Sequence, residues 1–459
     1  MDMIRPKLSG NLFPPNIRKA LIAAAILGGL LCLTLVRYSH DGTWRIASLY
    51  ATVACIMALI VIYKNSLNKY EIAIFCFLCI QLFASVPIPG DFGDPTAYVL
   101  SYRYGVSSRG FIATIVDFLT AGDFISRYFV WHFILSNTVF LLFTMSAYIG
   151  NVIEKSKDDT KYFLIFLSFL WLSCFTAPSA YFYNNFDRTE IFALIISFLA
   201  MAIVRKPVIR WLMPLLTLAI IATHIIQVFF YIPFVAILLF YGIIEKDRRG
   251  KRSMLLLGTT VALLLIAFLC YVMFARGTFA FENADDFYNY LSSKTDLNLR
   301  PSSLHAFMFA DLEDHLAGWK ERVGLMYRGN LAILINIPLL FLFMIFWAKC
   351  FIKETEKIKR MFFLLPMAVL PYQATVFFLF WDFARWMIMI LNVQFLLVFY
   401  LAAAKNKTVL AVIQTVTPFI RRYAFFIALM LLIMIYIGPV GYAYPSDRMT
   451  RFFHFFTGR

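Results

Sequence analysis

The sequence is poor in charge and in histidine. Only 15% of its 459 residues are charged, 6 are histidine, and 61% are hydrophobic. A soluble domain carries roughly 25% charged residues, so this composition excludes a soluble protein. The mean hydropathy of +0.76 instead predicts an all-α polytopic membrane protein, folded as a single integral membrane domain over residues 1–459.

Cysteine is scarce as well, and its placement excludes two kinds of cross-link. All 7 cysteines lie in or beside apolar runs, without the loop spacing of a zinc site or a disulfide framework. We therefore expect them to be packing residues. The chain also lacks a nucleotide-sugar motif in a soluble domain. Its first apolar run, 20–37, lacks an obvious small-residue cleavage site, so we expect it to be retained as a span.

Apolar runs of membrane-spanning length recur along the whole chain. A spanning helix needs about 20 mostly apolar residues, and the runs predict about 13 such helices, within a range of about 11 to 15. A break at His224 divides two of them, and 408–420 is predicted to lie on the inner surface as a helix. The predicted spans are 20–37, 46–63, 70–88, 128–150, 162–178, 189–204, 211–223, 225–243, 255–275, 329–348, 362–380, 387–403 and 423–441.

The basic residues predict the orientation, because short cytoplasmic loops hold an excess of Lys and Arg. With the N-terminus inside, the inner segments hold 26 of the 42 basic residues. The net charge of +16 is then explained by anchoring to an anionic inner leaflet and indicates no nucleic-acid partner. These inner segments are 1–19, 64–69, 151–161, 205–210, 244–254, 349–361 and 404–422.

The remaining polar groups gather on the predicted outer side. Polar groups at apolar depth are costly and usually serve a pathway or a site, so the gathering predicts one outward-facing cavity. The one large outer loop, 276–328, is expected to bind an acceptor or to act as a lid. The candidate site residues are Asp91, Asp94, Arg103 and Arg109 after the third span, Asn185, Asp187 and Arg188 after the fifth, His224, and Asp382, Arg385 and Trp386 between the eleventh and twelfth.

Two motifs in the outer segment 89–127 carry a family resemblance. "GDFGDP" is an acidic pair in an early outer loop, and "VSSRGFIATIVDFL" predicts an amphipathic helix lying on the membrane surface. This layout resembles the GT-C superfamily, the multi-spanning glycosyltransferases that take sugars from polyprenyl-phosphate carriers, and the related Wzy-type polysaccharide polymerases. In that superfamily the early acids serve as catalytic base or metal ligand. In well-known members the acidic loop follows the first span, whereas here it follows the third.

The resemblance implies a glycosyltransferase of the bacterial inner (plasma) membrane, with a cytoplasmic N-terminus and an active site facing the periplasm. A sugar or oligosaccharide would move from a polyprenyl-phosphate-linked donor to a glycan or lipid-linked acceptor during cell-surface polysaccharide assembly, among membrane lipids. Asp94, with Asp91, would supply the catalytic carboxylate. No cofactor follows with certainty, and a divalent metal at the acidic pair stays an open alternative.

Glycosyl transfer requires a base and a cation. An inverting enzyme needs one carboxylate to take the proton of the acceptor hydroxyl. Arginine suits the leaving phosphate, because its planar fork gives two hydrogen bonds to the phosphate oxygens. Arg109, Arg188 and Arg385 all lie near a predicted interface, where a polyprenyl phosphate presents its head group.

Each candidate also has a structural explanation. Asp91 and Asp94 precede a proline, as in a turn and helix cap. Asp187 can cap the sixth span while Arg188 snorkels to the interface, and His224 can be a packing residue.

A structural explanation also exists for the pair Asp382 and Arg385, which are three residues apart and can bind each other on one helical face. For the whole protein, the alternatives are a Wzy-type O-antigen or capsule polymerase and a non-enzymatic flippase or transporter of lipid-linked sugars. A transporter would need internal repeats or broken helices in matching halves, and none is evident beyond the break at His224.

Overall fold

The computed structural model describes residues 12–90, 93–107, 109–173, 186, 188–206, 208–245, 250–274, 280–281, 283–308, 319–379 and 383–437. In these residues the structure is helical, with one isolated bridge between Ile125 and Thr295. The first half contains α1 (Pro15–Tyr38), α2 (Gly42–Lys64), α3 (Lys69–Ser85), η1 (Pro95–Tyr98), η2 (Tyr102–Tyr104), α4 (Gly110–Leu119), α5 (Arg127–Glu154), α6 (Asp158–Leu172), α7 (Glu190–Ile203), η4 (Ile209–Leu212), α8 (Met213–Thr223) and η5 (Ile225–Val228). The second half contains α9 (Tyr231–Ile244), α10 (Gly250–Phe274), α11 (Ala284–Lys294), α12 (Pro301–Met308), α14 (Trp319–Lys353), α15 (Lys357–Phe362), α16 (Leu364–Ala374), α17 (Val376–Leu379), α18 (Phe383–Ala403), α19 (Lys407–Arg422) and α20 (Ala424–Ile437).

Every segment predicted to span the membrane coincides at least in part with a helix, so the all-helical fold class is confirmed. Within the described residues, seven helical stretches are long and apolar enough to cross a membrane, and up to eight if α19 and α20, bent by 85°, count as one span. Several others are shorter, such as α7 with 14 residues and α8 with 11. The chain is thus a helical, multi-pass membrane protein, and the total of about 13 spans stays a prediction.

Polar caps start several of these helices. The side chains of Asp41, Asn68 and Ser126 each accept a hydrogen bond from a main-chain N–H in the first turn of α2, α3 and α5, which satisfies donors that a helix start leaves open. The predicted break at His224 is confirmed. α8 ends at Thr223, His224 is extended (φ −173°, ψ 127°), and η5 begins at the next residue.

The start of α14 differs from the sequence prediction. α14 begins at Trp319, ten residues before the predicted start of that span, so the C-terminal end of the segment 276–328 is helix; charged residues in this stretch hid the helix start, because the prediction relied on apolar runs. The same segment contains α11 and α12. The helix predicted within 89–127 is present as α4, and the helix predicted over 408–420 is present as α19.

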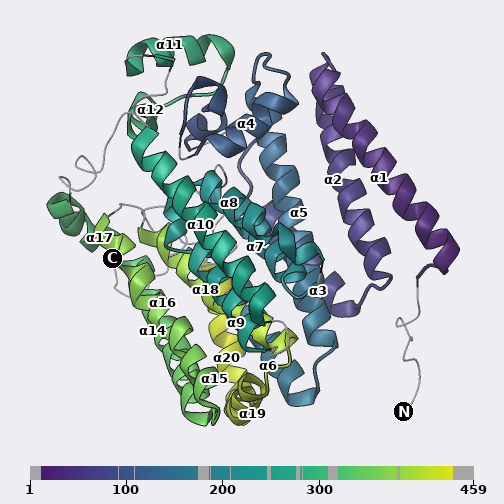
Figure 1. The fold of residues 1–459 in the computed structure, drawn as a ribbon, viewed down its shortest axis with the longest axis vertical. Helices are drawn as coiled ribbons and strands as arrows, with labels where there is room; N and C mark the ends of the chain where they lie inside the picture. Colours follow the sequence, from purple (N-terminus) through teal and green to yellow (C-terminus); the bar gives the residue numbers. More distant parts are fainter. Residues whose placement is uncertain are drawn as a thin grey trace.

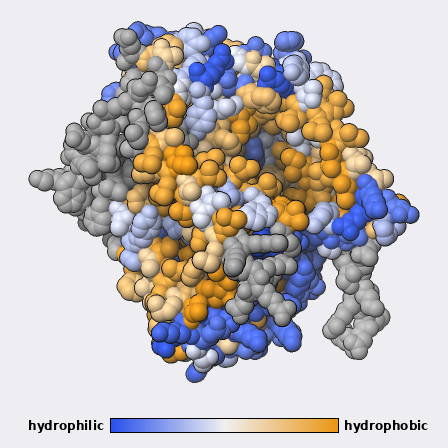
Figure 2. Space-filling model, viewed as in Figure 1, coloured by the Kyte–Doolittle hydropathy of each residue, from blue (hydrophilic) through white to orange (hydrophobic). Residues whose placement is uncertain are grey.

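The bundle has an apolar belt between two hydrophilic ends, as Figure 2 shows. Figure 1 places α4, α11 and α12 at one end and α15 and α19 at the other, with α1 and α2 along one flank. Helix α18 forms the centre, since 94% of its apolar stretch is buried. Polar side chains of α18 are bonded there: Trp171 Nε1 donates to Asn392 Oδ1 (2.9 Å) and Trp347 Nε1 to Gln394 Oε1 (2.7 Å).

Segments predicted to lie on the inner side contact one another. Arg205 of the segment 205–210 pairs with Glu245 (3.1 Å), Lys353 donates to the carbonyl of Ala411 (3.1 Å), and Arg421 pairs with Asp159 (2.9 Å). Each contact joins two predicted inner segments or their helix ends.

Segments predicted to lie on the outer side are likewise joined to one another. The main-chain N–H of Ile125 donates to the carbonyl of Lys294 (2.9 Å), and Arg45 pairs with Asp123 (3.8 Å). The two predicted sets of loops therefore occupy opposite ends of the bundle, and which end faces the cytoplasm stays a prediction.

Candidate functional site

The predicted outer end is covered by a structure that we name the cap, which comprises residues 93–107, 109–123, 280–281 and 283–308 (Figure 1). Its two parts are far apart in sequence and are hydrogen-bonded to each other. The Ser303 hydroxyl donates to Asp94 Oδ2, the Arg300 N–H donates to Thr96 Oγ1 (3.1 Å), and the Ala280 N–H donates to the carbonyl of Tyr104 (3.0 Å). The described part of the predicted outer segment 276–328 is thus bound to residues 94–104.

Asp94 is the organising residue of this contact. Its carboxylate caps η1 by accepting from the Thr96 N–H (3.3 Å), and its side chain is buried. Burial raises the pKa of Asp94, but the hydrogen bonds from Ser303 and Thr96 and the positive charge of Arg188 together lower it below the ordinary value. Asp94 is therefore an ionised carboxylate at neutral pH, and Arg188 lies close enough to act on it.

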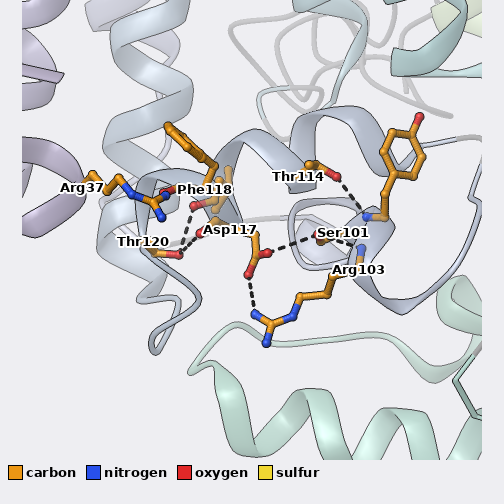
Figure 3. A network of polar contacts seen from close by, with 9 residues as sticks. Arg37, Ser101, Arg103, Thr114, Asp117, Phe118 and Thr120 are labelled. Atoms are coloured by element: carbon orange, nitrogen blue, oxygen red, sulfur yellow. Dashed lines mark hydrogen bonds and ion pairs between the residues drawn. The ribbon is translucent and has the colours of Figure 1, made fainter. Parts of the chain in front are cut away.

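A second acidic residue, Asp117 of α4, binds residues 101 and 103 of the outer segment 89–127, as Figure 3 shows. Arg103 Nη1 donates to Asp117 Oδ1 (3.1 Å) and the Ser101 hydroxyl donates to Asp117 Oδ2 (3.3 Å). Asp117 raises the pKa of Arg103 by accepting its hydrogen bond and by its negative charge. Arg103 is half exposed in this pair, and its observed role is to fix η2 on α4.

A buried ion pair lies at the N-termini of two central helices. Arg385 Nη1 is 3.4 Å from Glu190 Oε1, and the two side chains are 2% and 1% exposed. Glu190 lies in the first turn of α7, where the helix dipole favours an acid, whereas Arg385 lies in the first turn of α18, where the dipole disfavours a cation. Glu190 therefore supplies the charge that keeps Arg385 at this position.

Aromatic and polar side chains surround the pair. The Arg385 guanidinium lies 4.4 Å from the ring centroid of Trp386, which stacks on Phe230 (5.6 Å) and meets His224 edge-on (6.4 Å). His224 Nδ1 accepts from the Ile226 N–H (3.1 Å), which places the proton of the neutral imidazole on Nε2. The break between α8 and α9 thus brings a histidine to the start of α18.

Arg188 connects the ion pair to the cap. It precedes Glu190 by two residues, and its charge acts on Asp94. The neighbouring Phe186 packs on Trp131 of α5 (5.8 Å), which anchors this segment to the bundle. Residues from four predicted outer segments therefore meet at one end of the protein. We name these residues the polar cluster, and they are Asp94, Arg188, Glu190, His224, Arg385 and Trp386.

Other predicted site residues lie elsewhere or outside the described parts. Arg103 belongs to the network of Asp117. Arg109 is at the start of α4, where its N–H donates to Ser107 Oγ (3.3 Å). Four of the predicted residues lie outside the described residues: Asp91, Asn185, Asp187 and Asp382. Among the residues that are described, no group of three or more His, Cys, Asp or Glu side chains is placed to hold a metal ion.

The sequence interpretation missed Glu190, Asp117 and Ser303. Glu190 had a detectable signal, because it is an acid inside the predicted span 189–204, and an ionisable residue in a span is a functional hypothesis by default. Ser303 had none, since its role depends on a contact with a residue 209 positions away.

Positive groups lie beside the two acids of the polar cluster in the described residues. Two arginines and the N-termini of α7 and α18 contribute positive charge, and Glu190 balances one arginine. Helix N-termini together with arginine favour an anionic group such as a phosphate. Two aromatic pairs include residues of the polar cluster or their neighbours: Phe230 with Trp386, and Trp131 with Phe186.

Fold and site together define a multi-pass helical membrane protein with a polar cluster at one end of its bundle. No protein-family model, curated protein or solved structure matches the chain.

Proposed function

We propose that the chain is a membrane glycosyltransferase that moves a sugar or oligosaccharide from a polyprenyl-phosphate-linked donor to a glycan or lipid-linked acceptor at the outer face. The observation that carries this proposal is the polar cluster, in which the positive charge of Arg188 acts on the buried carboxylate of Asp94 although the two residues belong to separate loops. A transfer of this kind needs an ionised carboxylate beside a phosphate-binding cation, and the polar cluster contains both kinds of group.

In the proposed reaction the bond between the anomeric carbon and the phosphate oxygen breaks, and a bond to the acceptor oxygen forms. The acceptor hydroxyl gives its proton to Asp94, and polyprenyl phosphate leaves with its negative charge held by arginine. The lowered pKa of Asp94 makes it a weak base, so it accepts the proton only as the hydroxyl becomes acidic in the transition state. The hydrogen bond from Ser303 orients the carboxylate.

Of the two arginines in the polar cluster, Arg188 is the better candidate for the phosphate. Arg385 is 2% exposed and its charge is balanced by Glu190. Arg188 is only partly buried, so a ligand can reach it. In this proposal Arg385 therefore positions the start of α18 and Trp386, while Arg188 binds the leaving phosphate.

The test measures glycan transfer in membranes from cells that lack the native gene and express variants at equal level. We expect Asp94→Asn to reduce transfer by about 10²- to 10⁴-fold, as for loss of a general base. Arg188→Lys keeps the charge but loses the two-pronged geometry, and it should weaken donor binding more than it reduces the maximal rate. The matched control is Arg127→Gln, which removes an exposed outer arginine paired with Asp296.

Wild-type transfer by both Asp94→Asn and Arg188→Lys would contradict the proposal. Equal losses in all three variants, the control included, would also contradict it, because the effect would then follow from any lost outer charge. A product ladder instead of single additions would identify the polymerase alternative.

A further inference from the structure

An apolar groove opens on the half of the bundle away from the cap. It has a volume of about 740 Å³ and lies between α6, α14, α18, α19 and α20. Phe166, Leu342 and Met430 are among its apolar walls, and Val398 of α18 belongs to its lining. Its size is within the ~300–1,000 Å³ of ordinary small-molecule sites. Because the walls belong to membrane-embedded helices, the occupant must be apolar along most of its length.

One end of the groove carries a cation. Lys349 belongs to the lining, is exposed, and forms no ion pair or hydrogen bond with the part of the chain that the structure describes. Two neighbouring cations do have protein partners. Lys353, one turn further along α14, donates to the carbonyl of Ala411, and Arg421 pairs with Asp159. Within the described residues, Lys349 is therefore a charge at the rim of an apolar groove with no protein group to balance it.

We propose that this groove binds one anionic phospholipid, with an acyl chain between α14 and α20 and its phosphate head group on Lys349. The inference does not depend on the proposed glycosyltransferase activity. Lys349 lies at the end of the bundle where the predicted inner segments meet, which is where an inner leaflet presents anionic head groups.

The selectivity of the groove for one lipid over another must come from the head group. Moving an acyl chain from the bilayer into an apolar groove changes little hydrophobic free energy, since lipid tails are as apolar as the walls. The chain therefore gains packing contacts but little selectivity. A basic residue near the surface contributes roughly 1 kcal/mol of attraction to anionic lipid, which corresponds to about a fivefold preference.

The neighbouring helices fit a lipid that enters from the inner surface. α19 ends in Arg421 and Arg422, and the chain then turns by 85° into α20. The bend leaves Thr415 and Phe419 of α19 and Ile427 of α20 on the groove wall. A head group at Lys349 would lie under α19, and its chain would run along α20 toward the middle of the bundle.

The experiment is native mass spectrometry of the purified full chain, delipidated in detergent and titrated with phosphatidylglycerol or with phosphatidylcholine of the same chains. The wild type should retain one phosphatidylglycerol with about fivefold higher affinity than phosphatidylcholine. Lys349→Gln should abolish this preference. Lys357→Gln, which removes an exposed cation of α15 that does not line the groove, should keep it.

A second pair of variants tests the groove itself. Met430→Trp fills it from α20 and should weaken retention of both lipids, whereas Leu432→Trp lies on the same helix outside the lining and should leave retention unchanged. Equal preference in wild type and Lys349→Gln would overturn the head-group contact. Unchanged retention of both lipids in Met430→Trp would overturn the lipid as occupant of the groove.

Discussion

Arg385 lies where a helix dipole opposes its charge, and Glu190 is the described side chain that compensates it. Burying two charges is costly, and the pair is stable only while both partners are present. The cation is also held against the face of Trp386, so any change at Glu190 is transmitted to the aromatic ring and to His224 beside it.

We predict that Glu190→Gln destabilises the protein by about 3–5 kcal/mol, because the buried guanidinium of Arg385 loses the carboxylate of Glu190, which lies 3.4 Å away. Thermal unfolding in detergent measures the loss. The control is the double change Glu190→Leu with Arg385→Met, which removes both charges and should recover most of the stability. A single variant as stable as the wild type would show that Glu190 does not hold Arg385.

The ionisation of Asp94 predicts that the stability of the cap depends on pH. Its folded-state pKa is lower than the ordinary value, so its contribution to stability is complete above the unfolded pKa of about 3.9 and is lost as the pH falls through the lower folded value. Hydrogen exchange at the Arg300 amide, which donates to Thr96, should therefore lose protection on acidification from about pH 5 to below pH 3. Asp94→Asn should already lack that protection at neutral pH.

A matched variant separates Asp94 from a general acid effect on the cap. Asp117→Asn changes a cap carboxylate that binds Arg103 and Ser101 on the early loop and not α12, so the Arg300 amide should stay protected in this variant at neutral pH. Loss of protection in both variants to the same extent would refute a specific role for Asp94.

Single residues were predictable where their type conflicts with their surroundings. Asp94, Arg188 and His224 are polar groups flanking apolar runs; the charge of Arg188 acts on Asp94, and His224 meets Trp386 edge-on. The contact between Arg385 and Glu190 was not predictable, because the two residues are almost 200 positions apart; Asp382, the partner that the sequence suggests, lies outside the described residues. Spacing along one helix reports local pairs only.

At the scale of elements, helix crossings depend on a few small residues. Gly150 of α5 lies against α3, and a Cβ atom there would come within 2.6 Å of the Glu71 nitrogen and 2.8 Å of its Cα. Main-chain atoms cannot move aside as a flexible side chain can, so the two helices approach this closely only because residue 150 has no side chain.

Gly150→Ala should therefore destabilise the protein by about 1–3 kcal/mol, the cost of overpacking. The comparison is Gly258→Ala in α10, where a Cβ would meet no atom within 4 Å, and alanine there should be neutral or stabilising by up to about 1 kcal/mol. Thermal unfolding of the two variants in one detergent gives the difference directly. A Gly150→Ala protein as stable as the Gly258→Ala protein would contradict the close crossing of α3 and α5.

Elements were largely predictable because an apolar run of sufficient length forms a helix in a membrane, where every main-chain group must be bonded internally. The run 211–243 was divided correctly at His224, since one helix would be too long to cross. The start of α14 was predicted too late, because its first turns carry Lys320, Glu321 and Arg322, and charged residues of this kind are equally typical of a loop.

For the whole molecule, contacts separate the predicted inner and outer segments into two groups. The sequence predicted this separation from the distribution of Lys and Arg alone. One span too many or too few in the prediction would have put basic loops at both ends of the bundle. The side of the membrane that each group faces is a prediction from the same charge distribution.

We expect tags inserted in 244–254 or 349–361 to be protected from a membrane-impermeant reagent in intact cells, and tags in 276–328 to be accessible. Permeabilised cells, in which all tags should react, provide the control. Tags from both groups on the same side would overturn the predicted orientation and the outward-facing site.

The docking of Ser303 on Asp94 also fixes an order of events during synthesis. The two residues are 209 positions apart, so when Asp94 has been synthesised its partner has not yet been translated. The early loop must remain uncapped while the helices from α5 to α10 are made and inserted. A chain interrupted before Ser303 would therefore lack the hydrogen bond that covers Asp94, and we expect its segment 93–107 to be more accessible to proteases than in the finished protein.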